Sequence, residues 1–113
     1  MALSKEIILE NGITLNYHRI VSLNVITNIN NIIEVASYVN ESQREKEQEY
    51  QELQKKSASG EELTTEEQEL LDKGINIYIE TKYENTEYDE TMSVKSAYEY
   101  LKTLPEFEGA KDI

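Results

Sequence analysis

The only histidine of this 113-residue chain, His18, lies in the segment GITLNYHRIVSLNVIT. A histidine acts as a general base or a metal ligand when carboxylates or other ligating side chains converge on it. On an extended strand, its neighbours on the same face are Asn16 and Ile20, and neither is a carboxylate. The chain has no second histidine, no HExxH motif and no calcium-binding ligand string. We therefore predict that His18 is a structural or interface residue without a catalytic role.

Other catalytic arrangements also lack support in the sequence. The absence of cysteine excludes disulfides, thiolate metal sites and thiol catalysis. The four glycines form no phosphate-binding loop, and no serine has the flanking residues of a nucleophile elbow. Some of the 23 acidic residues must be neighbours, but nothing in a chain this small indicates the cleft that a glycosidase needs. We expect no enzymatic activity, no cofactor and no metal, and we name no catalytic residue.

Tyrosine is unusually common, with eight residues against one phenylalanine and no tryptophan. Tyrosine combines apolar area with a hydroxyl that tolerates water, so it suits surfaces that are half-buried against a partner. Packing at the rim of a small core is the alternative for most of them. If the alternation of their strands directs Tyr17 and Tyr83 to the core, Tyr78 lies on the opposite face. We therefore predict Tyr78, together with His18 and Asn16, as interface residues.

The strand that holds His18 is predicted over residues 13–27. Its apolar residues fall on one side of an alternating pattern, as in a strand with one buried face: Ile13, Leu15, Tyr17, Val21, Leu23 and Val25. The alternation slips at Arg19 and Ile20, and a strand of this length exceeds the usual range. We therefore expect a bend or bulge at this point.

Two turns enclose this strand. Asn11-Gly12 predicts a type I′ hairpin turn after a first strand over residues 4–10, because both central positions of that turn need positive φ. The asparagine-rich segment 27–31 predicts a second turn, which leads into a third strand over residues 31–40. Three strands joined in this way form an antiparallel meander.

Residues 41–73 differ in character from the strands. Their first half contains helix-forming residues without glycine or proline, and a break follows at SASG. Thr64 and Glu67 then have the spacing of a capping box for a second helix, which Gly74 is placed to end. Apolar residues are few in both helices, so little of either can be buried. We predict an acidic helical hairpin that projects from a single domain of residues 1–113.

The last part of the chain completes an α+β fold. The clearest alternation in the sequence predicts a fourth strand over residues 75–84. Ser93 is placed to cap a helix over residues 94–104, which Pro105 ends. The order β-β-β-αα-β-α predicts a mainly antiparallel sheet with the C-terminal helix packed over one face.

The net charge of −12 restricts the classes of partner. Phosphate groups repel an acidic chain, so we expect no nucleic-acid binding. No run of 18 apolar residues is present, so we expect no membrane span, and the first twelve residues lack the pattern of a secretion signal. Acidic residues crowd the segment between Glu41 and Asp72, which is typical of a solvated appendage.

Three segments carry a family resemblance: NGITLNYHRIVSLN, EVASYVNESQREKE and SAYEYLKTLPEFEGAKDI. They resemble small proteins encoded among the tail genes of tailed phages and prophages of Gram-positive bacteria. The resemblance covers most of the chain except KKSASGEELTTEEQELLDKG. It implies a virion protein of the tail tip or baseplate, made in the host cytoplasm, whose partners are other tail or baseplate subunits. We expect a homo-oligomer, and the resemblance brings no catalytic residues.

A second functional class is a small acidic phage inhibitor that mimics DNA and blocks a host nucleic-acid-binding protein. The net charge of −12 is compatible with such a role. A mimic spreads its carboxylates along a surface at phosphate-like spacing, whereas we expect most of them on one helical hairpin. The sequence therefore favours assembly into a particle over inhibition.

Overall fold

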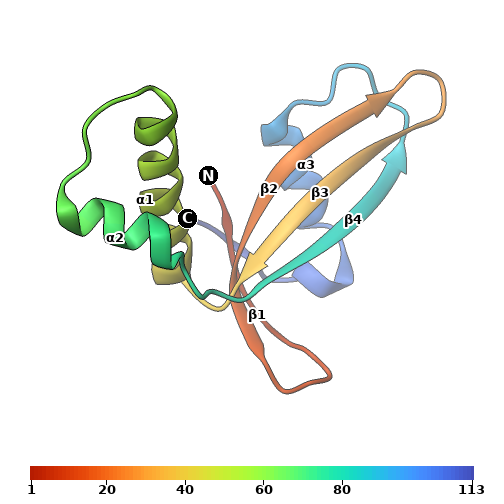
Figure 1. The fold of residues 1–113 in the computed structure, drawn as a ribbon. Coiled ribbons are helices and arrows are strands. Elements are labelled where there is room, and N and C mark those ends of the chain that lie inside the picture. The colour runs from red at the N-terminus through yellow and green to blue at the C-terminus, as the bar shows by residue number, and fades with distance from the viewer.

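The computed structural model describes residues 1–113 and has the predicted α+β fold (Figure 1). Its elements in chain order are β1 (Leu3–Ile8), β2 (Thr14–Ile26), β3 (Asn30–Tyr38), α1 (Glu41–Ala58), α2 (Thr65–Lys73), β4 (Ile79–Glu87), α3 (Val94–Leu101), a 3-10 helix η1 (Pro105–Phe107) and β5 (Lys111–Asp112). The five strands form one antiparallel sheet in the order β4-β3-β2-β1-β5. The expected meander is therefore present, with one added strand at each edge.

The turn between β1 and β2 is not the predicted type I′ turn. Gly12 has a φ of 88°, whereas Asn11 keeps a negative φ. The Gly12 N–H donates to the Leu9 carbonyl at 2.9 Å, and the Leu9 N–H donates to the Ile13 carbonyl at 2.8 Å. This is a three-residue loop with a glycine bulge. The Asn11 Oδ1 accepts a hydrogen bond from the Ile13 N–H at 3.1 Å, so its side chain rather than a left-handed backbone shapes the loop.

The expected bulge in β2 lies at Val21. Ile20 pairs with Val35 and Ser22 pairs with Glu34, so Val21 is an extra residue opposite β3. Because successive strand residues point to opposite faces, one extra residue exchanges the faces of all residues that follow.

The single apolar face predicted for β2 is therefore wrong. Leu15 and Tyr17 lie before the bulge on one face of the sheet. Leu23 lies after the bulge on the other face, with His18 and Ile20, because their partners on β3 alternate without interruption. The sequence pattern showed where the alternation slipped, and the structure shows that its two halves serve different faces.

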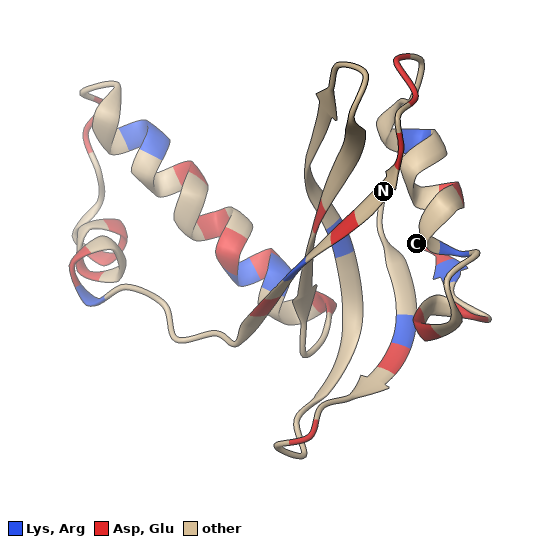
Figure 2. Ribbon diagram, turned by 90° about the vertical axis from the view of Figure 1, so that its right-hand side faces the viewer, with Lys and Arg blue, Asp and Glu red and all other residues tan.

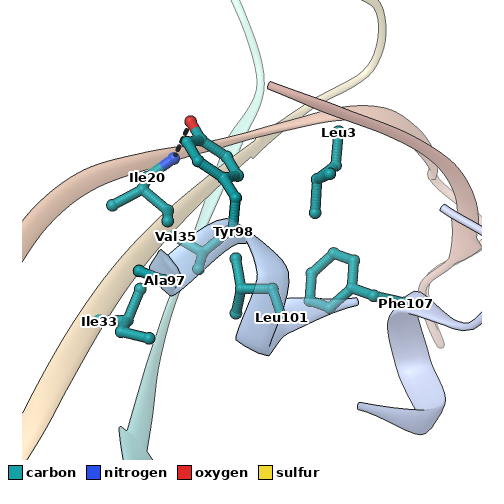
Figure 3. Close-up of a cluster of buried hydrophobic side chains, with 8 residues drawn as sticks. All are labelled: Leu3, Ile20, Ile33, Val35, Ala97, Tyr98, Leu101 and Phe107. Carbon is teal, nitrogen blue, oxygen red and sulfur yellow. Dashed lines mark hydrogen bonds between the residues drawn. The ribbon is translucent and has the colours of Figure 1, made fainter. Parts of the chain in front are cut away.

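Helix α3 and η1 cover the face of the sheet that holds Ile20. Figure 3 shows the buried cluster between them and the sheet: Leu3, Ile20, Ile33, Val35, Ala97, Tyr98, Leu101 and Phe107. Beside the bulge, the Ile20 N–H donates to the Tyr98 hydroxyl at 2.9 Å, and this hydroxyl donates to the Met1 carbonyl at 2.8 Å. Tyr98 therefore links the helix to β2 and to the start of the chain.

The predicted boundaries of the fourth strand and the last helix need correction. β4 begins at Ile79 because this residue pairs with Tyr38, the last residue of β3. After Tyr38 the chain leaves the sheet and enters α1, so residues 75–78 have no strand to pair with. α3 ends at Leu101, and Pro105 starts η1 instead of ending the helix.

The acidic hairpin of residues 41–73 is confirmed as two helices without buried residues, and it stands to one side of the sheet (Figure 1). The Thr64–Glu67 capping box is present, and Gly74 ends α2 with a φ of 75°. α1 is joined to the sheet through Glu47, which accepts a hydrogen bond from the Tyr38 hydroxyl at 2.7 Å.

Removing the Tyr98 hydroxyl should destabilise the fold. The Tyr98→Phe variant leaves the buried Ile20 N–H without this acceptor, and we expect the free energy of unfolding to fall by about 1–3 kcal/mol. Urea denaturation measures it. Tyr83→Phe, at a side chain that is 64% exposed, is the control and should change stability by less than about 0.5 kcal/mol. Equal effects of the two variants would contradict the role given to Tyr98.

The hairpin should be dispensable for folding. Replacing residues 55–73 by a short Gly/Ser linker removes α2 and the end of α1 but keeps Glu47, so cooperative thermal unfolding should persist. The reason is that neither helix contributes a buried residue. Loss of a cooperative transition would show that the hairpin belongs to the core.

Candidate interaction surface

His18 lies in the interior of the protein, with 0% of its surface exposed. Its Nε2 is 2.7 Å from the Lys5 carbonyl oxygen, which can only accept, so Nε2 carries the hydrogen. Its Nδ1 then accepts a hydrogen bond from the Ser37 hydroxyl at 2.7 Å. The Phe107 ring packs edge-on against the imidazole with 5.2 Å between ring centroids. The predicted interface role of His18 is therefore wrong, because no part of the side chain can reach a partner.

The surroundings of His18 keep the imidazole neutral. Burial lowers the pKa of His18 from its ordinary value of 6.5, since it removes water from the charged form. The hydrogen bond to the Lys5 carbonyl and the charge of Glu106 act in the opposite direction, and the charge of Lys82 adds to the lowering. Burial is the largest of these effects.

Asn16 and Tyr78 lie at the same end of the sheet, where β3 leaves it and β4 enters. Asn16 is exposed, and its Nδ2 donates to the Val39 carbonyl at 3.2 Å. Tyr78 is half-buried, and its hydroxyl donates to the Glu80 carboxylate at 2.9 Å. No hydrogen bond joins the two predicted residues to each other. Their role as interface residues stays a prediction.

Tyr83 is the tyrosine that the structure exposes most, although its alternation pointed to the core. It is 64% exposed, and its hydroxyl donates to the Glu34 carboxylate at 3.2 Å. Glu34 also accepts a hydrogen bond from the Ser22 hydroxyl at 2.9 Å. The strand pairing extends this row of side chains along the face opposite α3. We call it the open face: Ser22, Asn24, Ile26, Glu34, Tyr83 and Asn85.

The outer edge of β4 is the longest unpaired edge of the sheet. β4 is the terminal strand and pairs with β3 over nine residues without a register shift. At the other side of the sheet, β5 has two residues, and β1 has an irregular register between Ser4 and Ile7. An edge without a bulge presents its backbone N–H and C=O groups to a partner strand. The unpaired fourth strand after the predicted meander was the only sequence signal for this edge.

Charged side chains of β4 meet η1 on the face that α3 covers. The Lys82 Nζ is 2.8 Å from a Glu106 carboxylate oxygen. A hydrogen bond with Glu106, followed by burial, raises the pKa of Glu84 to about 7, while the pKa of Glu106 is lowered. The two carboxyl groups thus share one proton close to neutral pH. They lie on the surface, apart from the larger hollows of the molecule.

The acidic residues are distributed more widely than predicted (Figure 2). The hairpin of residues 41–73 contains eleven of the 23, and the other twelve lie on the remaining chain. Helices α1 and α2 enclose a groove of about 430 Å³ with a mainly charged lining: Glu49, Glu52, Leu53, Lys56, Glu66, Glu67 and Leu70. The expectation that most carboxylates lie on the hairpin is therefore wrong.

None of the three α-helices is both long and apolar enough to cross a lipid bilayer. No group of three or more His, Asp or Glu side chains is arranged to hold a metal ion. No protein-family model, no curated protein and no solved structure matches the chain.

The buried histidine should make stability depend on pH. The folded pKa of His18 lies below its unfolded value of 6.5, so its neutral form stabilises the fold fully above pH 6.5. That contribution is lost as the pH falls from 6.5 through the folded pKa. We expect the difference in free energy of unfolding between the wild type and His18→Gln to shrink from pH 7 to pH 5.

Urea denaturation at each pH measures this difference, and the comparison cancels the titration of Glu84, which both proteins share. A difference that stays constant or grows toward pH 5 would contradict the neutral, buried assignment. Stoichiometric zinc binding by the wild type that His18→Gln abolishes would contradict the structural role.

Proposed function

We propose that this protein is a non-enzymatic structural component of a phage tail or baseplate and acts by binding other protein subunits. The observation that carries the proposal is the unbulged outer edge of β4, next to the open face with its exposed Tyr83. A free strand edge offers main-chain hydrogen bonds to an added strand, and side chains on the adjoining faces give the contact its specificity.

The hairpin between β2 and β3 supplies a second exposed apolar area. Ile29 is 72% exposed at its tip, and Val25 and Ile26 beside it are 39% and 36% exposed. Asn28 forms the turn with a φ of 61°. A projecting tip with apolar side chains is suited to a contact with a neighbouring subunit. The assignment to a tail or baseplate depends on the resemblance of the three sequence segments to tail-gene proteins.

The second candidate is the acidic inhibitor that mimics DNA. The wide distribution of the carboxylates favours the inhibitor more than the predicted distribution did, because twelve of the 23 lie outside the acidic hairpin of residues 41–73. Binding of this kind depends on charge and weakens steeply as salt rises. Strand pairing depends on hydrogen bonds and buried side chains. The two copies in a homo-oligomer each carry a charge of −12 and repel each other, so added salt should strengthen their association.

Mass spectrometry of purified particles tests the tail assignment. We expect the chain to remain with particles of the encoding phage or prophage after high-salt washing, because its contacts do not depend on opposite net charges. A non-structural protein of the same phage is the control and should be removed. A pull-down from host lysate over a salt series provides the opposing test. Absence from particles, together with salt-sensitive capture of a nucleic-acid-binding protein, would reject the proposal in favour of the inhibitor.

A further inference from the structure

The side chains of β4 have a pattern that selects one partner for its free edge. The strand reads IETKYENTE, and its outer edge is unpaired along all nine residues. Glu80, Lys82 and Glu84 alternate in sign along the face that α3 covers. An edge strand with charged side chains resists most partners, because an apolar or a like-charged strand would lie opposite those charges.

We propose that β4 pairs antiparallel with β4 of a second copy, across a twofold axis at Tyr83, so that the two sheets become continuous. This inference deepens the proposed function, because it names one occupant of the binding edge on which that function rests. An isologous contact of this type needs a self-complementary strand. The sequence of β4 meets this requirement over its full length in one register, whereas a register centred on Thr81 sets Glu80 opposite Lys82 but pairs only residues 79–83.

The register centred on Tyr83 brings opposite charges together. It pairs all nine residues of β4, and Lys82 of each copy lies opposite Glu84 of the other. Tyr83 lies opposite its own symmetry mate, and Thr81 lies opposite Asn85. Opposite charges and aromatic pairs across neighbouring strands both stabilise a sheet. No position of this register places two like charges opposite each other.

The neighbouring registers are disfavoured by the same side chains. An antiparallel pair with a twofold axis normal to the sheet joins residues of the same face, so the register can shift only in steps that keep the faces matched. Centring on Lys82 places this lysine opposite itself and Glu80 opposite Glu84. Centring on Glu84 places this carboxyl opposite its own copy. Both shifts pair like charges and shorten the ladder, so charge and ladder length together define the register.

The surroundings of β4 are compatible with a second strand. Thr81, Lys82, Tyr83 and Asn85 are all exposed. Glu106 already lies beside Lys82 and Glu84, so an added lysine from the second copy meets the carboxyl groups of both glutamates. The acidic hairpin joins the sheet at the end of β3 near Tyr38 and not along this edge, which leaves its charge directed elsewhere.

Charge reversal tests the register. Sedimentation at about 0.15 M salt, which screens charges more than roughly 8 Å apart but screens the adjacent cross-strand pairs much less, should show a dimer of the wild type. Glu84→Lys should weaken dimerisation by about tenfold or more, because each copy then sets a lysine opposite Lys82. This variant gives Glu106 a second lysine as neighbour, so the chain should stay folded by circular dichroism. The double variant Lys82→Glu with Glu84→Lys restores both cross-strand pairs and should dimerise like the wild type.

Cysteine cross-linking tests the position of the axis. The chain has no cysteine, so Tyr83→Cys introduces a single thiol that lies opposite its own copy. Mild oxidation should convert this variant to a disulfide-linked dimer. Ala58→Cys is the matched control, since Ala58 is exposed but lies at the end of α1 on the acidic hairpin, and it should not cross-link at a comparable rate.

Three results would overturn the inference: a monomeric wild type at about 0.15 M salt, a Glu84→Lys variant that dimerises undiminished, or a folded double variant that stays monomeric. These outcomes are separate from the fate of the tail proposal. A β4 dimer that is absent from particles would reject the tail assignment and keep the inference. A chain that is present in particles but does not cross-link at residue 83 would keep the tail assignment and reject the inference.

Discussion

β2 contains a bulge at Val21, where it has one residue more than the facing segment of β3, and the packing of most of the domain depends on this bulge. Before it, the residues that face α3 are His18 and Ile20, and after it Leu23 continues on the same face. One strand can thus extend over the whole core while its apolar pattern changes phase. The Tyr98 hydroxyl accepts the Ile20 N–H beside the bulge, which ties the helix to the point where the strand is irregular. The bulge also adds local twist, which lets the long strand curve over a small core.

Polar groups are also found in the interior of the domain. His18, Asn31 and Ser37 are buried on the face that α3 covers, and every buried side-chain nitrogen or oxygen has a hydrogen-bond partner. The Asn31 Nδ2 donates to the Asp89 carbonyl at 2.9 Å, which holds the loop that precedes α3. A buried polar group is costly only when it is unpaired, so these side chains fix the positions of neighbouring segments. They specify the packing of the interior.

The two edges of the sheet differ in how they are protected. On one side, β5 and the irregular β1 leave little regular edge, and Ala2 and Ile113 exchange two backbone hydrogen bonds that close the ends of the chain together. On the other side, β4 is regular and protected only by its charges. Charges on an edge oppose indiscriminate pairing, yet they permit pairing with a strand of complementary charge. The regular unpaired edge of the sheet therefore lies at β4, next to the open face.

Local signals in the sequence were sufficient for the order of the main elements. Period-two alternation located β2 and β4, and turn residues delimited β1 and β3. The Thr64–Glu67 box and Ser93 located two helix starts, and the break at Arg19–Ile20 lay beside the bulge. These features depend on neighbouring residues only. The tertiary structure decided the rest: β4 could start only where β3 offered a partner, and β5 exists because the two ends of the chain meet. The burial of His18 also required the structure, because a residue on a bulged strand is buried only if a helix packs on the face where that residue lies. Alternation gives the spacing of side chains along a strand, whereas burial is set by segments distant in the sequence.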